Sequence, residues 1–134
     1  MTPLIWGFRA VLGGFWLWAG LSKWLYGFDA TAFLQGALGN PAVQAAPYAG
    51  LTVAVVEWLV KTGMPVVNAV IPLLEVALGV WFVSGKVLRG AALGQAGMSL
   101  MFVVCGAISW NPLLLASSCV LLALPLPLPL PKKP

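Results

Sequence analysis

A few ionisable side chains interrupt the long apolar stretches of this sequence, and they are the residues whose chemistry needs an explanation. Glu75 lies within residues 71–79, where every other residue is apolar or glycine. A carboxyl group in such surroundings is costly unless it is paired, neutralised or reached by water. Two interpretations of Glu75 follow: a carboxyl group that handles protons or faces a quinone, or one half of an ion pair that holds two helices in register.

Three basic residues lie within or beside the first two apolar stretches. For the ion pair we expect Arg9 to be the partner, because two antiparallel helices would bring the two residues within about one helical turn along the axis. Lys23 lies near the end of the first apolar stretch, and we expect it to extend toward water or to pair with Glu57. A pair near water would contribute less than about 1 kcal/mol. Arg89 follows the short connection after the second stretch.

Two uncharged polar residues share one face of the third apolar stretch. Gln95 and Ser99 are four residues apart, and Gly90, Gly94 and Gly97 lie close to them in the sequence. One interpretation is close helix packing through small residues, with hydrogen bonds from the amide and hydroxyl groups. In the other interpretation, Gln95 donates a hydrogen bond to a quinone carbonyl, so that both residues face the quinone.

Cys105 and Cys119 are expected on neighbouring helices, near the same ends. They are interpreted either as a redox pair or as free thiols that pack as small apolar groups. The sequence has no histidine, which is the usual axial ligand of haem and the commonest metal ligand. We therefore expect no metal site and no covalently bound cofactor, and a quinone is the cofactor that stays under consideration.

Four apolar stretches must position these residues. Three of them reach the ~20 residues that a helix needs to cross a hydrocarbon core of ~30 Å, and the fourth has about a dozen. Hydrophobic residues make up 61% of the chain, charged residues make up 7%, and the mean hydropathy is +1.00, unlike a soluble domain. The sequence therefore predicts an all-α membrane protein, with one domain over residues 1–134 that forms a four-transmembrane-helix bundle. The predicted spans are residues 4–26, 64–84, 87–109 and 112–124.

The basic residues predict how these spans are oriented. If the helices alternate in direction, one side of the membrane receives Arg9, Lys86, Arg89, Lys132 and Lys133. The other side receives Lys23 and Lys61, which are offset by Asp29 and Glu57. By the positive-inside rule both termini are cytoplasmic and residues 27–63 are external. Because the basic residues are dispersed and flank the spans, we expect the chain to contact the lipid bilayer and not nucleic acid.

The external segment and the C-terminal tail carry further signals. Leu51, Val55 and Trp58 fall at helical spacing, so residues 48–61 predict an interfacial helix that caps the bundle. Residues 124–134 are dominated by alternating leucine and proline, which forbids a continuing helix and favours polyproline II. This tail is interpreted as a stiff end that leaves the membrane, or as a strap that docks on another subunit.

The order of these residues resembles a known family. Residues 9–24, which read RAVLGGFWLWAGLSKW, resemble the opening helix of DoxX/DoxD proteins, in which an arginine-led apolar helix ends in Ala-Gly-x-x-Lys. The glutamate-containing helix and basic turn of that family are similar to the segment with Pro72, Glu75, Gly79, Gly85 and Arg89. The resemblance covers most of the chain, although its many tryptophans and its Leu-Pro tail depart from a typical member.

The resemblance implies a small integral membrane protein, which in the DoxD branch is the membrane subunit of a thiosulfate:quinone oxidoreductase. Carried over to this sequence, it implies that Arg9, Lys23, Glu75 and Arg89 organise a polar site between the first two helices. A quinone headgroup or an anion would approach that site.

Two functional hypotheses stay open. The first is a DoxX-like subunit in membrane redox metabolism, which transfers electrons from thiosulfate to quinone together with a partner subunit. The second is a noncatalytic accessory subunit of a larger respiratory or photosynthetic complex. Whether the chain is itself an enzyme is left open, and a transporter has little support because no inverted repeat is recognised. Both hypotheses place the protein in the cytoplasmic membrane of a bacterium or archaeon, or in a specialised bioenergetic membrane.

Overall fold

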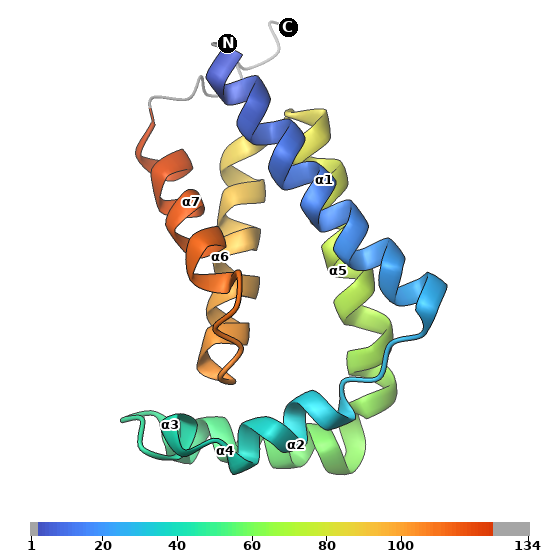
Figure 1. Cartoon of the computed structure of the whole chain (residues 1–134), viewed down its shortest axis with the longest axis vertical. Helices are drawn as coiled ribbons and strands as arrows, with labels where there is room; N and C mark the ends of the chain where they lie inside the picture. Colours follow the sequence, from blue (N-terminus) through green and yellow to red (C-terminus); the bar gives the residue numbers. More distant parts are fainter. Residues whose placement is uncertain (1–2, 125–134) are drawn as a thin grey trace, which may run out of the picture.

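The computed structural model describes residues 3–124, which form helices joined by short connections and contain no β-strand. Two pairs of helices stand side by side, and a third layer of short helices lies across one end of them (Figure 1). The all-helical prediction is therefore confirmed for the part of the chain that the structure describes. Residues 125–134, which are most of the predicted Leu-Pro tail, lie outside the described residues.

Helix α1 (Pro3–Tyr26) lies antiparallel along helix α5 (Met64–Ser84) as the first pair (Figure 1). Glycine allows the two backbones to approach closely. A Cβ atom on Gly20 would lie 2.8 Å from the carbonyl oxygen of Pro72, and one on Gly79 would lie 2.7 Å from the backbone nitrogen of Leu17. Larger residues at these two positions would push the helices apart, so small residues fix the register of α1 on α5.

Helix α6 (Leu88–Val104) and helix α7 (Asn111–Ala123) form the second pair (Figure 1). The chain reverses between them at Gly106, whose φ of 86° is in the left-handed region that favours glycine. Pro112 lies in the first turn of α7, where its missing N–H group has no intrahelical partner to lose. The predicted third span, residues 87–109, is thus helical only as far as Val104.

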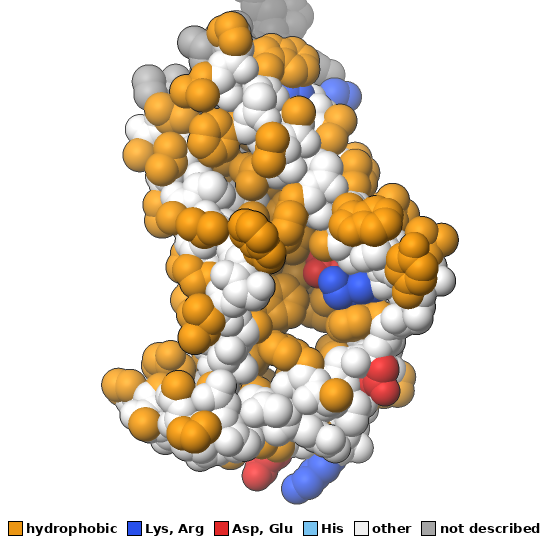
Figure 2. Space-filling view, in the orientation of Figure 1, with side chains coloured by type: hydrophobic (Ala, Val, Ile, Leu, Met, Phe, Trp, Pro, Cys, Tyr) orange, Lys and Arg blue, Asp and Glu red, His pale blue; other side chains and the backbone are white. Residues whose placement is uncertain are grey.

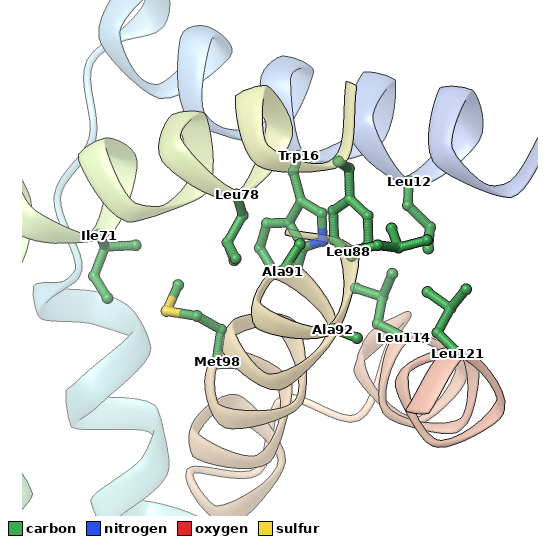
Figure 3. Close-up of a cluster of buried hydrophobic side chains, with 11 residues drawn as sticks. Leu12, Trp16, Ile71, Leu78, Leu88, Ala91, Ala92, Met98, Leu114 and Leu121 are labelled. Carbon is green, nitrogen blue, oxygen red and sulfur yellow. The ribbon is translucent and has the colours of Figure 1, made fainter. Parts of the chain in front are cut away.

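The two pairs meet in an apolar cluster near the connection between α5 and α6. Figure 3 shows Trp16 of α1 directed toward Leu88 and Ala91 of α6, with Leu114 and Leu121 projecting into the same cluster from α7, beside α6. All five side chains are buried. Toward the opposite end of the molecule the pairs diverge, so they enclose a wedge that widens toward the third layer (Figure 1).

The third layer crosses the wide end of this wedge (Figure 1). It consists of α2 (Thr31–Gly39), α3 (Pro41–Gln44) and α4 (Ala49–Trp58). A second buried cluster, formed by Ala30, Leu34 and Val56, holds the layer together.

Helix α4 continues through the π-helical turn η1 (Leu59–Gly63) into α5, and the chain changes direction there. The helix predicted at residues 48–61 is present as α4 and the start of η1. Helices α2 and α3 were not predicted from the sequence, because the glycine and proline residues in that part favoured irregular chain.

Two helices are long and apolar enough to cross a membrane: α1 and the continuous 36-residue helix Ala49–Ser84. Only 28% and 33% of their most apolar windows are buried, whereas a core helix of a soluble protein is mostly buried. Large apolar side chains such as Val11, Leu25 and Leu73 are exposed, and apolar groups cover much of the face in Figure 2. A surface of this kind is typical of contact with lipid or with another apolar partner. Helices α6 and α7 are also apolar but shorter.

Candidate functional site

A buried ion pair joins α1 to α5. The Nζ atom of Lys23 lies 2.8 Å from Oε1 of Glu75, to which it donates a hydrogen bond, and also 2.8 Å from Oε2. The side chain of Glu75 is 4% exposed and that of Lys23 is 24% exposed. The ammonium group therefore offsets part of the cost of burying the carboxylate among apolar side chains.

The ammonium group of Lys23 is held in place by further contacts. It donates a hydrogen bond of 3.2 Å to the carbonyl oxygen of Ala19 and lies 5.4 Å from the ring centroid of Phe28. Both carboxylate oxygens of Glu75 lie 2.8 Å from this ammonium group, so each has a positively charged partner. The site is thus a largely buried ion pair in which the ammonium group contacts both carboxylate oxygens.

Arg9 does not pair with Glu75, and this expectation was wrong. Its guanidinium group lies at the C-terminal end of α5, where Nε donates a hydrogen bond of 3.0 Å to the carbonyl oxygen of Phe82 and Nη2 donates to that of Val83. The group also lies 4.3 Å from the ring centroid of Trp6. The last carbonyl groups of a helix lack intrahelical donors and carry partial negative charge, so they are favourable partners for a buried cation.

Two further expectations about charged residues need correction. Lys23 pairs with Glu75 and not with Glu57, which is exposed on α4. Arg89 is exposed in the first turn of α6, at the end of the bundle away from the third layer. Of the four residues that the family resemblance implied for a polar site, the structure brings only Lys23 and Glu75 into contact.

Gln95 is the centre of a second buried polar group, which joins three helices. Its Oε1 accepts a hydrogen bond of 2.7 Å from the indole nitrogen of Trp16 in α1. Its Nε2 lies 2.8 Å from each of three acceptors in α7: the carbonyl oxygen of Leu114 and the hydroxyl groups of Ser117 and Ser118. Because Gln95 is fully buried and both ends of its amide are used, it is a packing residue and does not face a ligand in this conformation.

The other predicted features of the third stretch are only partly found. Ser99 is fully buried one turn after Gln95, but its hydroxyl group has no hydrogen-bond partner among residues 3–124. Of the three glycines, only Gly94 packs closely against another helix, where a Cβ atom would lie 2.7 Å from Leu78. A Cβ atom on Gly90 would contact only Val87, three residues earlier in the chain, and one on Gly97 would have no neighbouring atom within 4 Å.

An apolar cavity of about 450 Å³ lies between the diverging helix pairs and the third layer. Figure 2 shows a hollow in the middle of this face, between two apolar columns. The lining is apolar apart from the hydroxyl group of Thr52 and the thiol of Cys105. The cavity is in the usual size range of small-molecule sites. Its lining residues come from four parts of the chain, among them Phe28, Leu34, Val56, Val67, Ile71, Leu100, Met101 and Val104.

Neither Lys23 nor Glu75 is among the residues that line this cavity, but two of the lining residues are neighbours of the ion pair. Phe28 lines the cavity and is also the ring beside the ammonium group of Lys23. Ile71 lines it too, and lies one helical turn before Glu75 on α5. Side chains on a helix lean toward its N-terminus, so the carboxylate of Glu75 leans toward the turn that contains Ile71.

Cys105 and Cys119 are not joined by a disulfide bond. Cys105 is half-buried at the end of α6 and lines the cavity, whereas Cys119 is exposed on α7. Cys119 follows Asn111, the first residue of α7, by eight positions, which is about 12 Å along a helix. The expected juxtaposition of the two thiols is therefore wrong, and they do not form a redox pair here.

Several residues of the site were missed by the sequence reasoning. The indole group of Trp16 had a recognisable signal, because a tryptophan within an apolar stretch needs an acceptor for its N–H group. Ser117 and Ser118 were not singled out, because serine is also common in membrane helices as a small packing residue. Asn68 accepts a hydrogen bond of 2.9 Å from the backbone of Ala30 and so ties the third layer to α5. The cavity had no sequence signal, because it arises from the angle between the helix pairs.

Comparison with known proteins finds no matching family model, no matching curated protein and no matching solved structure. The interpretation of the site therefore depends on its own geometry.

Proposed function

We propose that this chain is a four-span integral membrane protein that binds a lipid-soluble quinone between its helix pairs. In this proposal it works as a DoxX-like membrane subunit in redox metabolism, and a partner subunit supplies the electrons. The observation that carries the proposal is an apolar cavity whose lining residues Phe28 and Ile71 are neighbours of the buried Lys23–Glu75 ion pair.

The distribution of apolar and charged residues supports the membrane position. Helices α1 and α5 are long and apolar enough to span, and the apolar helices α6 and α7 run beside them. Lys86 and Arg89 lie at the α5–α6 connection, where α1 also begins, whereas Asp29, Glu57 and Lys61 belong to the opposite end. This charge asymmetry supports cytoplasmic termini and an external third layer, in the cytoplasmic membrane of a bacterium or archaeon or in a specialised bioenergetic membrane.

Exposed aromatic residues support the same placement. Trp24, Tyr26 and Trp110 are exposed near the third layer, and Trp6 and Trp81 are exposed near the opposite end. Indole and phenol rings favour the headgroup level of a bilayer. The third layer would then lie along the outer interface, and the wedge between the helix pairs would open among the acyl chains.

The chemistry of the site supports a quinone more than a free anion. The charge of Lys23 is already neutralised by Glu75, so little attraction is left for an anion such as thiosulfate. The cavity offers an apolar surface for a hydrophobic tail, and the ion pair offers polar atoms for a headgroup. A quinone, when bound there, would carry two electrons and two protons, while Lys23 and Glu75 would hold its headgroup at the end of the cavity.

The proposal is tested by isolating the protein from its native membrane in mild detergent, identifying what co-purifies, and assaying thiosulfate-dependent quinone reduction. We expect Glu75→Gln to abolish the activity of the preparation. Glu57→Gln is the matched control, because it makes the same change at an exposed position on α4 and should leave the activity unchanged. Full activity in a Glu75→Gln preparation with normal composition would contradict the proposal.

A noncatalytic accessory subunit is the second candidate, and the Gln95 group favours it. Both ends of this buried amide are used to hold α1, α6 and α7 together, as a purely structural bundle requires. This candidate predicts stoichiometric co-purification with a larger membrane complex whose activity does not change in Glu75→Gln. The same experiment therefore separates the two functions.

A further inference from the structure

Thr52 of α4 lines the apolar cavity, and its hydroxyl group has no partner in the described part of the chain. The residue is 7% exposed, and its side chain makes no hydrogen bond to any residue between 3 and 124. A hydroxyl group within a helix often bonds to the backbone carbonyl group four positions earlier. Thr62 does so at 2.8 Å and Ser118 at 3.0 Å. Thr52 does not, so its hydroxyl group can bind a group inside the cavity.

This hydroxyl group belongs to the wall of the cavity that the third layer forms. Val56, one turn after Thr52 on the same face of α4, is a member of the buried cluster that holds this layer together. Cys105, the other lining residue with a polar side-chain group, packs against the same cluster. The uncharged polar groups of the lining are therefore both beside the third layer, and a polar group of a ligand is expected there.

The lining limits which ligands can bind. No charged side chain is among the described residues that line the cavity, and a charged group without a partner is very costly in such surroundings. A carbonyl oxygen is also costly to bury unless it receives a hydrogen bond, and a threonine hydroxyl group can donate one. The cavity therefore fits a neutral, largely apolar molecule with a carbonyl group that faces α4.

We infer that Thr52 is a ligand-binding residue of this cavity, whose hydroxyl group donates a hydrogen bond to a carbonyl oxygen of a neutral apolar ligand. The inference deepens the proposed quinone site and rests on it. A para-quinone carries carbonyl groups on opposite sides of its ring, so an acceptor is left for Thr52 when the other carbonyl group is held elsewhere. Without a ligand, no residue between 3 and 124 pairs with this hydroxyl group, which is a cost to stability that a bound carbonyl group removes.

The experiment titrates the full chain in lipid nanodiscs with two ligands. Decylplastoquinone has two carbonyl oxygens as its only polar atoms, and decylbenzene has a similar ring and tail without oxygen. Thr52→Val removes the hydroxyl group and keeps the branched shape, so the quinone should bind about fivefold more weakly, which is the effect of one neutral hydrogen bond. The affinity for decylbenzene should be unchanged. Each ligand partitions into the same lipid, so the ratio between variant and wild type depends on the protein alone.

Two further variants and one further measurement test the role of the hydroxyl group. Thr52→Ser keeps the group and should retain quinone affinity within about twofold. Thr62→Val makes the same change at an exposed threonine and should leave quinone affinity unchanged. Thr52→Val should also unfold at the same temperature as the wild type or at a higher one, because it removes a buried hydroxyl group that has no partner without ligand.

The outcomes separate the inference from the proposed function. Equal quinone affinity of the wild type and Thr52→Val would overturn the inference and leave the quinone site standing. Equal losses of affinity in Thr52→Val and Thr52→Ser would overturn it too, as would a marked loss of thermal stability in Thr52→Val. Failure of the wild type to bind decylplastoquinone would refute the proposed function, and the inference with it.

Discussion

The guanidinium group of Arg9 occupies the space in which a side chain on Gly85 would have to lie. Gly85 follows the last residue of α5 and has a φ of 63°, in the left-handed region. The absence of a side chain lets the chain turn toward α6 and lets Arg9 reach the carbonyl groups of Phe82 and Val83. One glycine thus serves both the end of α5 and its contact with α1.

Gly85→Ala should therefore destabilise the protein by about 2 kcal/mol or more, because the left-handed conformation is strained for alanine and Arg9 would be displaced from its acceptors. Thermal unfolding in detergent, followed by size-exclusion chromatography, measures the loss. Gly97→Ala is the control, since a Cβ atom there would meet nothing within 4 Å, and it should be neutral or slightly stabilising. Equal stability of the two variants would contradict the double role of Gly85.

The error over the partner of Glu75 has a definite physical origin. The sequence places Arg9 and Glu75 at similar depths if the two helices are aligned by the ends of their apolar stretches. Glycine contacts determine the alignment instead, since Gly20 packs against Pro72 and Val76. This register brings Lys23 to Glu75 and places the guanidinium group of Arg9 at the C-terminal end of α5. Helix type and direction were predictable from hydropathy, whereas register depended on which glycines are in contact.

Lys23→Met should cost about 3 kcal/mol or more, because it leaves the buried carboxylate of Glu75 without a charge partner. The double variant Lys23→Met with Glu75→Met should recover most of this loss, since a buried ion pair is often replaced by apolar residues without penalty. Unfolding temperatures of the wild type, both single variants and the double variant give the coupling free energy. A double variant as unstable as the sum of the single variants would show that the two residues do not interact.

The amide of Gln95 was recognised from the sequence as a residue of interest, and the structure shows hydrogen bonding within a packed bundle. The four-residue spacing of Gln95 and Ser99 correctly indicated a shared buried face. It did not reveal the partners, because Trp16, Ser117 and Ser118 come from helices whose rotation the sequence does not specify. Polar residues within apolar stretches can be identified in advance, but their partners depend on the assembled bundle.

Trp16→Phe and Gln95→Leu should each destabilise the protein, since each removes one end of the 2.7 Å hydrogen bond between α1 and α6. Their combined effect should be smaller than the sum by about 0.6–1.7 kcal/mol, the range expected for a hydrogen bond between membrane helices. A double-mutant cycle on unfolding free energies measures this difference. Trp18→Phe, which changes an exposed tryptophan on the same helix, should have little effect and serves as the control.

The helices of the third layer could be predicted from the sequence only in part. The helical spacing at residues 48–61 correctly indicated α4, but α2 and α3 are stabilised by contacts that are distant in the sequence. Val56 of α4 packs with Ala30 and Leu34 near the start of the layer, and Asn68 of α5 binds the backbone of Ala30. Short helices of this kind depend on tertiary packing more than on propensity, so their local sequence is a weak predictor.

Asp29 should make the start of this layer, at the first residue of α2, sensitive to acid. Its carboxylate accepts a hydrogen bond of 2.6 Å from the hydroxyl group of Thr31 and one of 2.9 Å from the backbone nitrogen of Thr31. These bonds, first that of the hydroxyl group, lower the pKa of Asp29 below its ordinary value. A carboxyl group whose pKa is lowered by folding stabilises the folded state above its unfolded pKa of about 3.9, and this contribution is lost as the pH falls through the lower, folded value.

We therefore expect the protection factor of the Thr31 amide, which is the intrinsic exchange rate divided by the observed rate, to fall below about pH 4 as the carboxylate is protonated. In Asp29→Asn the titrating group is absent, so protection of this amide should be lower near neutral pH and independent of this titration. Glu57→Gln, at an exposed position on α4, should keep the wild-type dependence. If protection in Asp29→Asn still fell with acid as in the wild type, another group would have to be the origin of the effect.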